Sequence, residues 1–222
     1  MNKFYVIILL LKVISMNAQK DSLNLGDKYL EDQLYLDITY NVLKKKLKEV
    51  KSSSFSYGAC VGYIRDIPIV KSGKMALGIG IGYGYDSFAH GLKVVENNSG
   101  FTLEVSNSAD NKLLTHNLEM PLQFRLRSSN SRIYSFWRIY SGVKLSYNLR
   151  NQFIDAQSNE IIPITDVSNF NKFQLGLTMS SGYGTFNFHI YYGLTSILKS
   201  ELIGQNLIDT KVFKIGVSLY IL

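Results

Sequence analysis

The sequence predicts an all-β fold: a transmembrane antiparallel up-and-down β-barrel of eight strands. Three observations predict it. Apolar residues alternate with polar or small ones in segment after segment, long connections alternate with short ones, and aromatic residues gather toward the ends of the apolar faces. Because successive side chains of a strand point to opposite faces, the alternation makes one face apolar and the other polar. A soluble sandwich alternates in the same way, so the connections and the aromatic residues decide between the two.

Strands are predicted at 33–43, 55–67, 75–88, 113–128, 135–150, 171–182, 185–198 and 212–222. The connections between them are long at 44–54, 89–112, 151–170 and 199–211, and short at 70–74, 129–134 and 182–184. Short periplasmic turns and longer outer loops are typical of bacterial outer-membrane barrels. An even number of strands then leaves both ends of the barrel on the periplasmic side.

Aromatic residues mark two levels on the outward faces. Near the expected outer rim these are Tyr40, Tyr57, Tyr83, Tyr85, Tyr147, Phe173 and Phe213. Near the periplasmic rim they are Tyr63, Phe124, Trp137 and Phe188. The residues between them are aliphatic, so the pattern matches the two interfaces of a bilayer. Closing the barrel also removes the sheet edges, which lipid cannot hydrogen-bond.

The first 18 residues predict a secretory signal peptide. Lys3 supplies a positive charge, an apolar stretch follows over 4–11, and Ala18 is the expected cleavage point. Eight apolar residues are too few to cross a hydrocarbon core of about 30 Å as a helix. Residues 19–31 are expected to form a short periplasmic lead, and 32–222 the barrel domain, in the outer membrane of a bacterium. The single cysteine, Cys60, excludes an internal disulfide and is expected to be a small packed residue.

The third predicted strand places four glycines on its inward face: Gly78, Gly80, Gly82 and Gly84. They alternate with apolar residues inside a strand, so they are not a phosphate-binding loop. Missing side chains let the wall curve or make room for a bulky neighbour. Side chains fill the interior of an eight-stranded barrel. A packed polar lumen, and not an open channel, is therefore expected from Asp37, Asn117, Glu119, Gln123, Arg125, Arg127, Arg138, Lys144 and His189.

The register of the fourth and fifth strands predicts charge pairs in this lumen. A turn centred between residues 131 and 132 places Glu119 opposite Lys144, a pair that would neutralise itself. The same register places Arg125 opposite Arg138, with Asp66 as the nearest acid.

A second cluster is expected at the periplasmic rim, formed by Arg65, Asp66, Arg125, Arg127 and Arg138. Two interpretations remain open. The cluster is either a structural ion-pair network that closes the barrel floor or a docking surface for a periplasmic partner.

Several stretches resemble the PorT family of outer-membrane barrels, which is associated with the type IX secretion system. They lie within residues 31–147 and comprise 31–35 with 39–41, Gly62–Ile69, Gly80–Tyr85, Glu119–Arg127 and Phe136–Tyr140 with Gly142 and Lys144. The last third resembles barrels only in general. The resemblance implies a small barrel needed for export of cargo proteins, with other secretion-system proteins as partners and no known chemistry of its own. A paralogous barrel with a structural or lipid-binding role is the alternative. Such sequences often carry the label "porin family", but a packed lumen argues against an open pore.

A basic run on the first outer loop, formed by lysines 44, 45, 46, 48 and 51, has two interpretations. It is either a solvated loop or a contact with phosphates of lipopolysaccharide, which salt would weaken. Outer-membrane lipid and lipopolysaccharide are thus the expected surroundings. Neither nucleic acid nor a small-molecule substrate is expected as a partner.

An enzyme is the rival class, because some small barrels modify lipids. The chain has three histidines, His90, His116 and His189. His116, outward near the outer rim and downstream of Ser106 and Ser108, is the best candidate for a lipid-modifying site. The preferred explanation is nevertheless a histidine at the bilayer interface. His189 is expected to be a satisfied lumen histidine. No metal-ligand spacing, dinucleotide fingerprint or phosphate loop occurs, so neither catalytic residues nor a cofactor is predicted.

Overall fold

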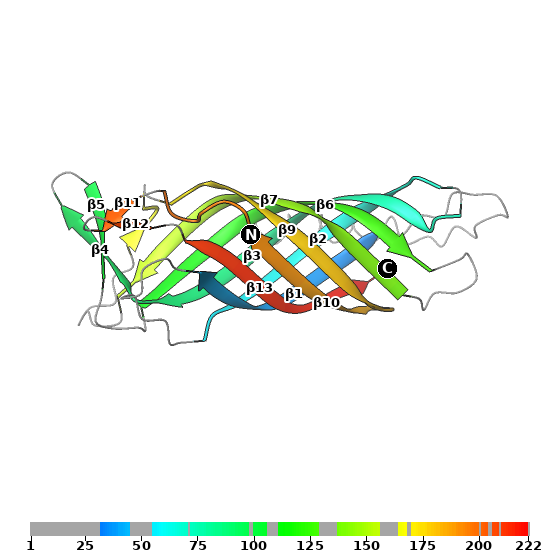
Figure 1. The fold of residues 1–222 in the computed structure, drawn as a ribbon, viewed down its shortest axis with the longest axis horizontal. Coiled ribbons are helices and arrows are strands. Elements are labelled where there is room, and N and C mark those ends of the chain that lie inside the picture. The colour runs from blue at the N-terminus through cyan, green and yellow to red at the C-terminus, as the bar shows by residue number, and fades with distance from the viewer. Residues whose placement is uncertain are drawn as a thin grey trace, which may run out of the picture.

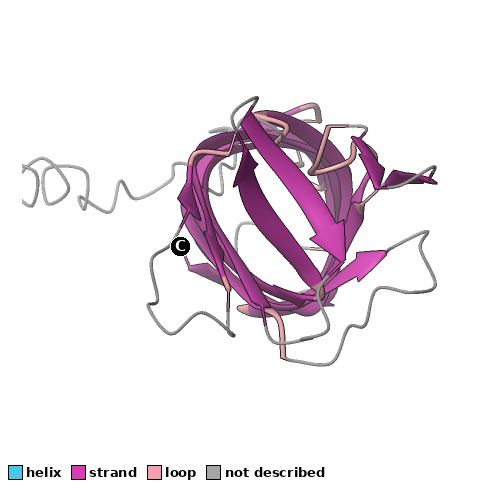
Figure 2. Cartoon of the chain, turned by 90° about the vertical axis from the view of Figure 1, so that its left-hand side faces the viewer, coloured by secondary structure: helices cyan, strands magenta, loops and turns pink. Residues whose placement is uncertain are grey.

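A computed structural model describes residues 32–44, 55–70, 72–97, 100–105, 111–128, 137–155, 164–167, 170–199, 201–203, 206–208 and 210–221. Eight long strands form one closed cylinder (Figures 1 and 2): β1 (Gln33–Lys44), β2 (Tyr57–Pro68), β3 (Met75–His90), β6 (Asn111–Arg127), β7 (Trp137–Ile154), β9 (Phe173–Tyr183), β10 (Phe186–Gly193) and β13 (Lys211–Ile221). Each pairs antiparallel with the next, and β13 pairs with β1 to close the ring. The predicted eight-stranded up-and-down barrel is confirmed.

The long connections all lie at one end of the cylinder, which we call the loop end, and the short ones at the other, the turn end (Figure 1). Within the long connections lie the short strands β4 (Leu92–Asn97), β5 (Gly100–Val105), β8 (Ile164–Thr165), β11 (Glu201–Ile203) and β12 (Asn206–Ile208). Only long connections were predicted there, so the β4–β5 and β11–β12 hairpins were not foreseen from the sequence. The predicted strand 185–198 was wrong in its last five residues, because β10 ends at Gly193.

Some predictions fall on residues outside the described ranges. These are the signal peptide (1–18), the periplasmic lead (19–31), four lysines of the first loop (Lys45, Lys46, Lys48 and Lys51) and the two serines Ser106 and Ser108. Among the described residues, no helix combines the length and the apolar character needed to cross a bilayer.

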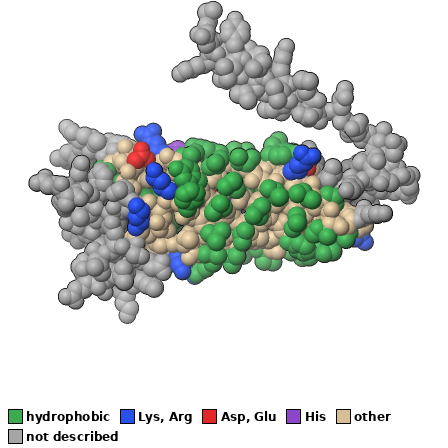
Figure 3. Space-filling model, turned by 90° about the horizontal axis from the view of Figure 1, so that it is seen from above, with side chains coloured by type: hydrophobic (Ala, Val, Ile, Leu, Met, Phe, Trp, Pro, Cys, Tyr) green, Lys and Arg blue, Asp and Glu red, His purple; other side chains and the backbone are tan. Residues whose placement is uncertain are grey.

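An apolar belt covers the outer wall of the barrel (Figure 3). Tyr40, Tyr57, Tyr83 and Phe173 are exposed at its loop end, and Tyr63, Trp137, Tyr183, Phe186 and Phe188 at its turn end. Exposed aliphatic residues such as Val61, Ile81 and Leu122 lie between them. Water-soluble monomers rarely expose a continuous apolar surface of this extent, whereas a closed ladder leaves no backbone group for lipid to satisfy. The wall is therefore built to face hydrocarbon, with an aromatic girdle at each interface.

Glycines of neighbouring strands make room for tyrosine rings in the lumen. Tyr35 on β1 lies opposite Gly62 on β2, which lies opposite Gly82 on β3. A Cβ atom on Gly62 would lie 2.5 Å from Cε1 of Tyr35, and one on Gly82 would overlap the Tyr35 hydroxyl. The four inward glycines of β3 therefore serve the second of the two expected roles, room for a bulky neighbour: a Cβ on Gly78 would meet Arg125, one on Gly80 Ile64 and one on Gly84 Glu119.

One irregularity breaks the wall near the loop end of β7. His116 of β6 pairs with Arg150, but the next residue, Asn117, pairs with Asn148, so Leu149 is an extra residue in β7. Such a bulge bends a strand and re-aims its side chains. Here it turns both Asn148 and Asn151 inward, three residues apart, and leaves Leu149 and Arg150 exposed.

We predict that Gly82→Ala lowers the free energy of unfolding by about 1–3 kcal/mol, because the added methyl group overlaps the Tyr35 hydroxyl. Urea titration of the barrel in phospholipid vesicles, followed by the fluorescence of Trp137, the single tryptophan, measures this. Combining Gly82→Ala with Tyr35→Phe should cost less than the sum of the two single changes. Gly193→Ala is the control, since its Cβ would meet nothing nearer than the Val212 carbonyl oxygen at 3.1 Å. Equal stability of Gly82→Ala and the unmodified protein would contradict the steric role.

Candidate functional site

Lys144 lies at the centre of an ion-pair cluster in the lumen. Its Nζ is 2.7 Å from Glu119 Oε2 and 3.4 Å from Asp37 Oδ2, and all three side chains are buried. The expected contact between Glu119 and Lys144 therefore exists. The register behind it was wrong: Lys144 lies opposite Pro121, and Glu119 opposite Ser146. The pairing of β6 with β7 is shifted by two residues from the expected register. An even shift keeps both side chains inward, and the long lysine reaches its partner diagonally.

A second ion pair, Lys214 with Asp86, was missed by the sequence analysis. Lys214 Nζ lies 2.7 Å from both carboxylate oxygens of Asp86. Asn41 Nδ2 donates to the same carboxylate at 2.8 Å, and Asn117 Nδ2 at 3.4 Å. The sequence did indicate that Asp86 faces inward, because it continues the alternation of the inward glycines of β3. Its partner is 128 residues away in sequence, however, and only the closed ring places the two together.

His189 lies in the same polar interior, as expected for a satisfied lumen histidine. Its Nδ1 is 2.7 Å from Ser180 Oγ, and its Nε2 is 4.0 Å from Asp37 Oδ2. Ser218 Oγ donates to the other oxygen of Asp37 at 2.5 Å. Cys60 is buried with its Sγ 3.6 Å from the Tyr35 hydroxyl oxygen, a packed position. Within the described ranges, no group of three or more His, Cys, Asp and Glu side chains is placed to hold a metal ion.

Asp66 anchors the floor of the lumen at the turn end. Its two carboxylate oxygens pair separately with Nη1 of Arg125 and Nη1 of Arg127, and all three side chains are fully buried. The guanidinium of Arg125 also lies over the Tyr140 ring, 4.5 Å from its centroid. Tyr140 is the cross-strand neighbour of Arg125, so the expectation that Arg138 lies opposite Arg125 was wrong; Arg138 faces Arg127. The same two-residue shift of register is the cause.

The floor arginines also bind the short turns. Arg127 Nε donates to the Gly73 carbonyl at 2.6 Å, and Arg138 Nη1 donates to the Gly184 carbonyl at 2.6 Å. Arg65, in contrast, does not belong to this cluster. Adjacent residues of a strand face opposite sides, so with Asp66 inward, Arg65 is exposed on the outer wall two residues from Tyr63. The burial of the remaining members favours the structural interpretation of the cluster over docking.

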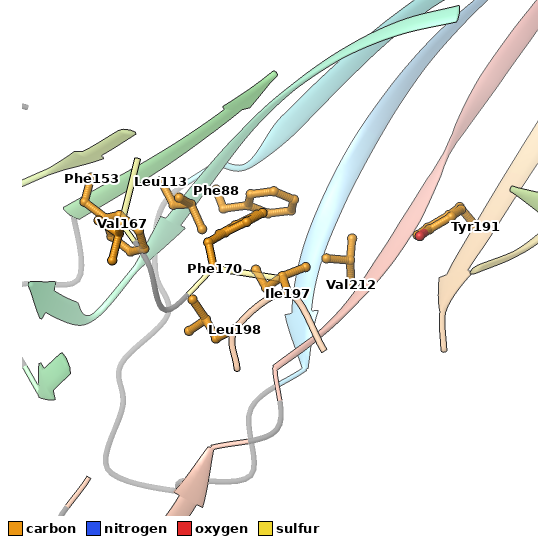
Figure 4. Close-up of a cluster of buried hydrophobic side chains, with 9 residues drawn as sticks. All are labelled: Phe88, Leu113, Phe153, Val167, Phe170, Tyr191, Ile197, Leu198 and Val212. Carbon is orange, nitrogen blue, oxygen red and sulfur yellow. The ribbon is translucent and has the colours of Figure 1, made fainter. Parts of the chain in front are cut away.

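An apolar cap fills the lumen at the loop end (Figure 4). Two connections supply it: Val167 and Phe170 follow β8, and Ile197 and Leu198 follow β10, with Phe170 bridged to Leu198. They pack against inward side chains of the strands, namely Phe88, Leu113, Phe153, Tyr191 and Val212. The cap was not predicted from the sequence, because a polar lumen was expected throughout and a strand was expected where Ile197 and Leu198 turn inward.

Little empty space remains between the cap and the ion pairs. Two cavities there, one lined by Asp86, Phe170 and Lys214 and the other by Asp37, Cys60 and His189, have volumes of about 10 Å³ each. Each has room for about one water molecule. Over the described residues, the lumen is thus a packed interior with ionic pairs at its centre and floor and apolar side chains at its mouth.

His116 lies on the outer wall at the loop-end girdle. Its Nδ1 is 2.5 Å from the Tyr83 hydroxyl oxygen, and its ring centroid is 5.2 Å from that of Tyr85. Its described neighbours are thus girdle aromatics, as at a bilayer interface. His90, the last residue of β3, is buried with its ring 5.7 Å from that of Phe153 in the cap.

A closed small barrel with an apolar outer wall and a filled lumen is the architecture of an integral outer-membrane protein. The model of the family described as "Outer membrane protein beta-barrel domain" matches residues 17–199. The chain belongs to this family, and the protein is a β-barrel of the bacterial outer membrane.

Two solved structures similar to this chain are crystal structures of Ail, the attachment invasion locus protein of Yersinia pestis. The one in complex with the heparin analogue sucrose octasulfate has 10% sequence identity and a TM-score of 0.38, and the match covers 86% of this chain and 99% of that chain. The other has 8% identity and a TM-score of 0.31, with 86% and 97% covered. Comparison with curated proteins gave no match.

We predict that Lys144→Met lowers the free energy of unfolding by about 3–5 kcal/mol, because Glu119 and Asp37 then lose the buried cation between them. Urea titration in vesicles measures it. Adding Glu119→Gln should restore part of the loss by removing one uncompensated carboxylate. Lys112→Met, at an exposed position of β6, should change stability little and is the matched control. A fully stable Lys144→Met protein would refute the role given to this ion pair.

We also predict that the purified barrel in planar bilayers gives no steady open-channel current, since side chains occupy the lumen from floor to mouth. Single-channel recording in molar potassium chloride is the measurement, with a known porin as the positive control. A reproducible ohmic conductance would show that water crosses the lumen and would contradict the packed interior.

Proposed function

We propose that this protein is a non-enzymatic component of protein secretion across the outer membrane, of the PorT type associated with type IX secretion. The observation that carries the proposal is the series of PorT-like stretches within residues 31–147, and the filled lumen limits how such a barrel could act. A cylinder with ionic and apolar side chains along its axis offers no passage to a polypeptide, so its contribution to export lies in its surfaces and its partners.

The PorT-like stretches supply part of the polar residues that fill this lumen. Glu119–Arg127 contributes the acid beside Lys144 and two arginines of the floor. Gly62–Ile69 contributes Asp66, and Phe136–Tyr140 contributes Arg138 and Tyr140. The resemblance therefore rests on the side chains that hold the interior together, which supports a shared barrel architecture more strongly than a shared partner.

A periplasmic partner would meet the exposed side chains of the turn end. Lys74 on the β2–β3 turn, Ser128 after β6 and Thr185 on the β9–β10 turn are accessible, whereas Arg127 and Arg138 are not. Charge reversal at Arg127 would break the floor, so docking is better tested at Lys74 and Thr185.

A paralogous barrel with a lipid-binding or structural role is the second candidate. Aromatic rings and exposed cations at the loop end, among them Lys172 and Lys199, favour contact with outer-leaflet lipid and lipopolysaccharide. A lipid-modifying enzyme built around His116 is the third. Release or transfer of acyl chains from lipopolysaccharide by the purified barrel would be its signature.

We predict that deleting the gene retains cargo proteins in the periplasm and depletes them from the culture supernatant, because export needs this barrel. Quantitative mass spectrometry of both fractions measures it. Complementation with the unmodified gene should restore secretion. Complementation with Lys74→Glu plus Thr185→Glu should not, although the folded barrel reaches normal levels, whereas Lys112→Glu at the opposite end serves as the control that does restore it. An unchanged supernatant in the deletion strain would leave the secretion role without support.

A further inference from the structure

The ladder of the barrel wall is interrupted at the loop end beside β7, between its pairing with β9 and its pairing with β8. β7 and β9 pair from Trp137 with Tyr183 up to Tyr147 with Phe173. β9 begins at Phe173, and one more backbone bond joins the Asn148 N–H to the Lys172 carbonyl oxygen at 2.7 Å. Farther along, β7 pairs with β8, where Gln152 lies opposite Thr165. The seam between the two pairings is a groove with a volume of about 810 Å³, lined by Asn148, Leu149, Asn151, Asp166, Val167, Phe170, Asn171, Lys172, Phe173 and Lys199. Sites for small molecules commonly have about 300–1,000 Å³.

Hydrogen bonds fix the floor of this groove. The amide of Asn148 donates to the carbonyl oxygens of His116 and Arg150 and so satisfies the backbone around the β7 bulge. Asn151 donates to Asn148 Oδ1 at 3.1 Å and accepts from the Val167 N–H at 3.0 Å. A bulge at the edge of a cavity is a common way to re-aim side chains around a site. The groove is thus a built feature of the strand ladder.

The far wall is fixed in the same way. Asn171 Nδ2 donates to the carbonyl oxygens of Ser196 and Leu198, which brings Lys199 to the groove. Asp166 adopts a left-handed backbone with a φ of 54°, a conformation that aspartate tolerates better than most residues. Its N–H donates to the Asn151 carbonyl at 2.9 Å.

The lining of the groove combines apolar side chains near the aromatic girdle with charged side chains nearer the loop end. At the lower edge Leu149 and Phe173 are 52% and 66% exposed on the outer wall. Phe173 belongs to the loop-end aromatic girdle through its contact with Tyr147, with ring centroids 5.0 Å apart. Above them lie two exposed ammonium groups, Lys172 and Lys199, and the exposed carboxylate of Asp166.

We propose that this groove binds the phosphorylated saccharide head group of an outer-leaflet glycolipid. Lys172 and Lys199 would pair with a phosphate, since ammonium groups bind phosphate through charge-assisted hydrogen bonds. Asp166 would accept hydrogen bonds from sugar hydroxyls. Leu149 and Phe173 would contact the first carbons of the acyl chains, which is why a membrane lipid fits the groove better than a soluble sugar phosphate. The site does not depend on the secretion role.

The test uses the full-length processed barrel in nanodiscs of phosphatidylcholine. Bis-phosphorylated lipid A is titrated, and the bound fraction is measured by native mass spectrometry. We expect saturable binding that the pair Lys172→Gln and Lys199→Gln weakens about tenfold, the effect of two lost exposed ion pairs. The matched pair Lys44→Gln and Lys112→Gln removes two exposed cations of the same rim outside the groove and should leave the affinity unchanged. All of these positions are exposed, so the variants should fold, and heat-modifiable migration on gels verifies it.

Three results would overturn the proposal. Equal binding of lipid A stripped of its phosphates would remove the role of the two lysines. An equal loss with the Lys44 and Lys112 pair would mean diffuse attraction to the whole rim. Displacement of bound lipid A by glucosamine phosphate at similar concentration would mean that the groove recognises a soluble sugar phosphate and not a membrane lipid.

Discussion

Closure of the hydrogen-bond ladder in hydrocarbon is the constraint on which the rest of this structure depends. Lipid offers no partner to an N–H or C=O group, so each strand within the bilayer must be paired on both sides. The pairing of β13 with β1 meets this requirement by joining the two ends of the barrel sequence. It also fixes the interior, because an eight-stranded cylinder with paired walls leaves a lumen that side chains must fill. The outer wall, free of that demand, needs only to be apolar and carries its aromatic residues at the two interfaces.

The narrow lumen then limits the positions at which bulky and charged side chains fit. Tyr35 occupies the space over Gly62 and Gly82, and the Tyr191 ring lies over Gly176 on the other side of the barrel. The charged side chains are limited by the same narrow space. Four buried carboxylates (Asp37, Asp66, Asp86 and Glu119) pair with two lysines and two arginines (Lys144, Lys214, Arg125 and Arg127), and Arg138 donates to the Gly184 carbonyl oxygen. Because a buried ion without a partner is strongly destabilising, this near balance is a condition for the barrel to fold and not in itself evidence of a function.

The sequence predicted those features that depend on parity and on length. Alternation within each strand identified which face of β3 or β6 is inward, and the long and short connections gave the strand count and the loop end. Parity also survives an error of two residues, which is why the contact of Glu119 with Lys144 was found although the register was wrong. Features that depend on exact register or on loops could not be found in this way. The opposition of Arg127 and Arg138 needed the centre of a turn, the Asp86–Lys214 pair needed the closed ring, and the cap needed Phe170 and Ile197 to fold back into the mouth. Arg65 was misplaced because its position at the rim was weighed above its outward parity.

The groove between β7 and β9 follows from the same constraint. A seam in the ladder exposes backbone groups, so it is tolerated only where water or polar head groups replace hydrocarbon. The last β7–β9 pair is Tyr147 with Phe173, two girdle aromatics, and β9 begins there while β7 continues. The amides of Asn148 and Asn151 then satisfy backbone groups that a neighbouring strand would otherwise have satisfied. The height at which the wall opens is therefore the height at which the bilayer becomes polar. In the described part of the chain, side chains of the cap and the floor fill the interior. A molecule that this barrel recognises is therefore expected to bind at such an opening or at the turns, on the outside of the cylinder.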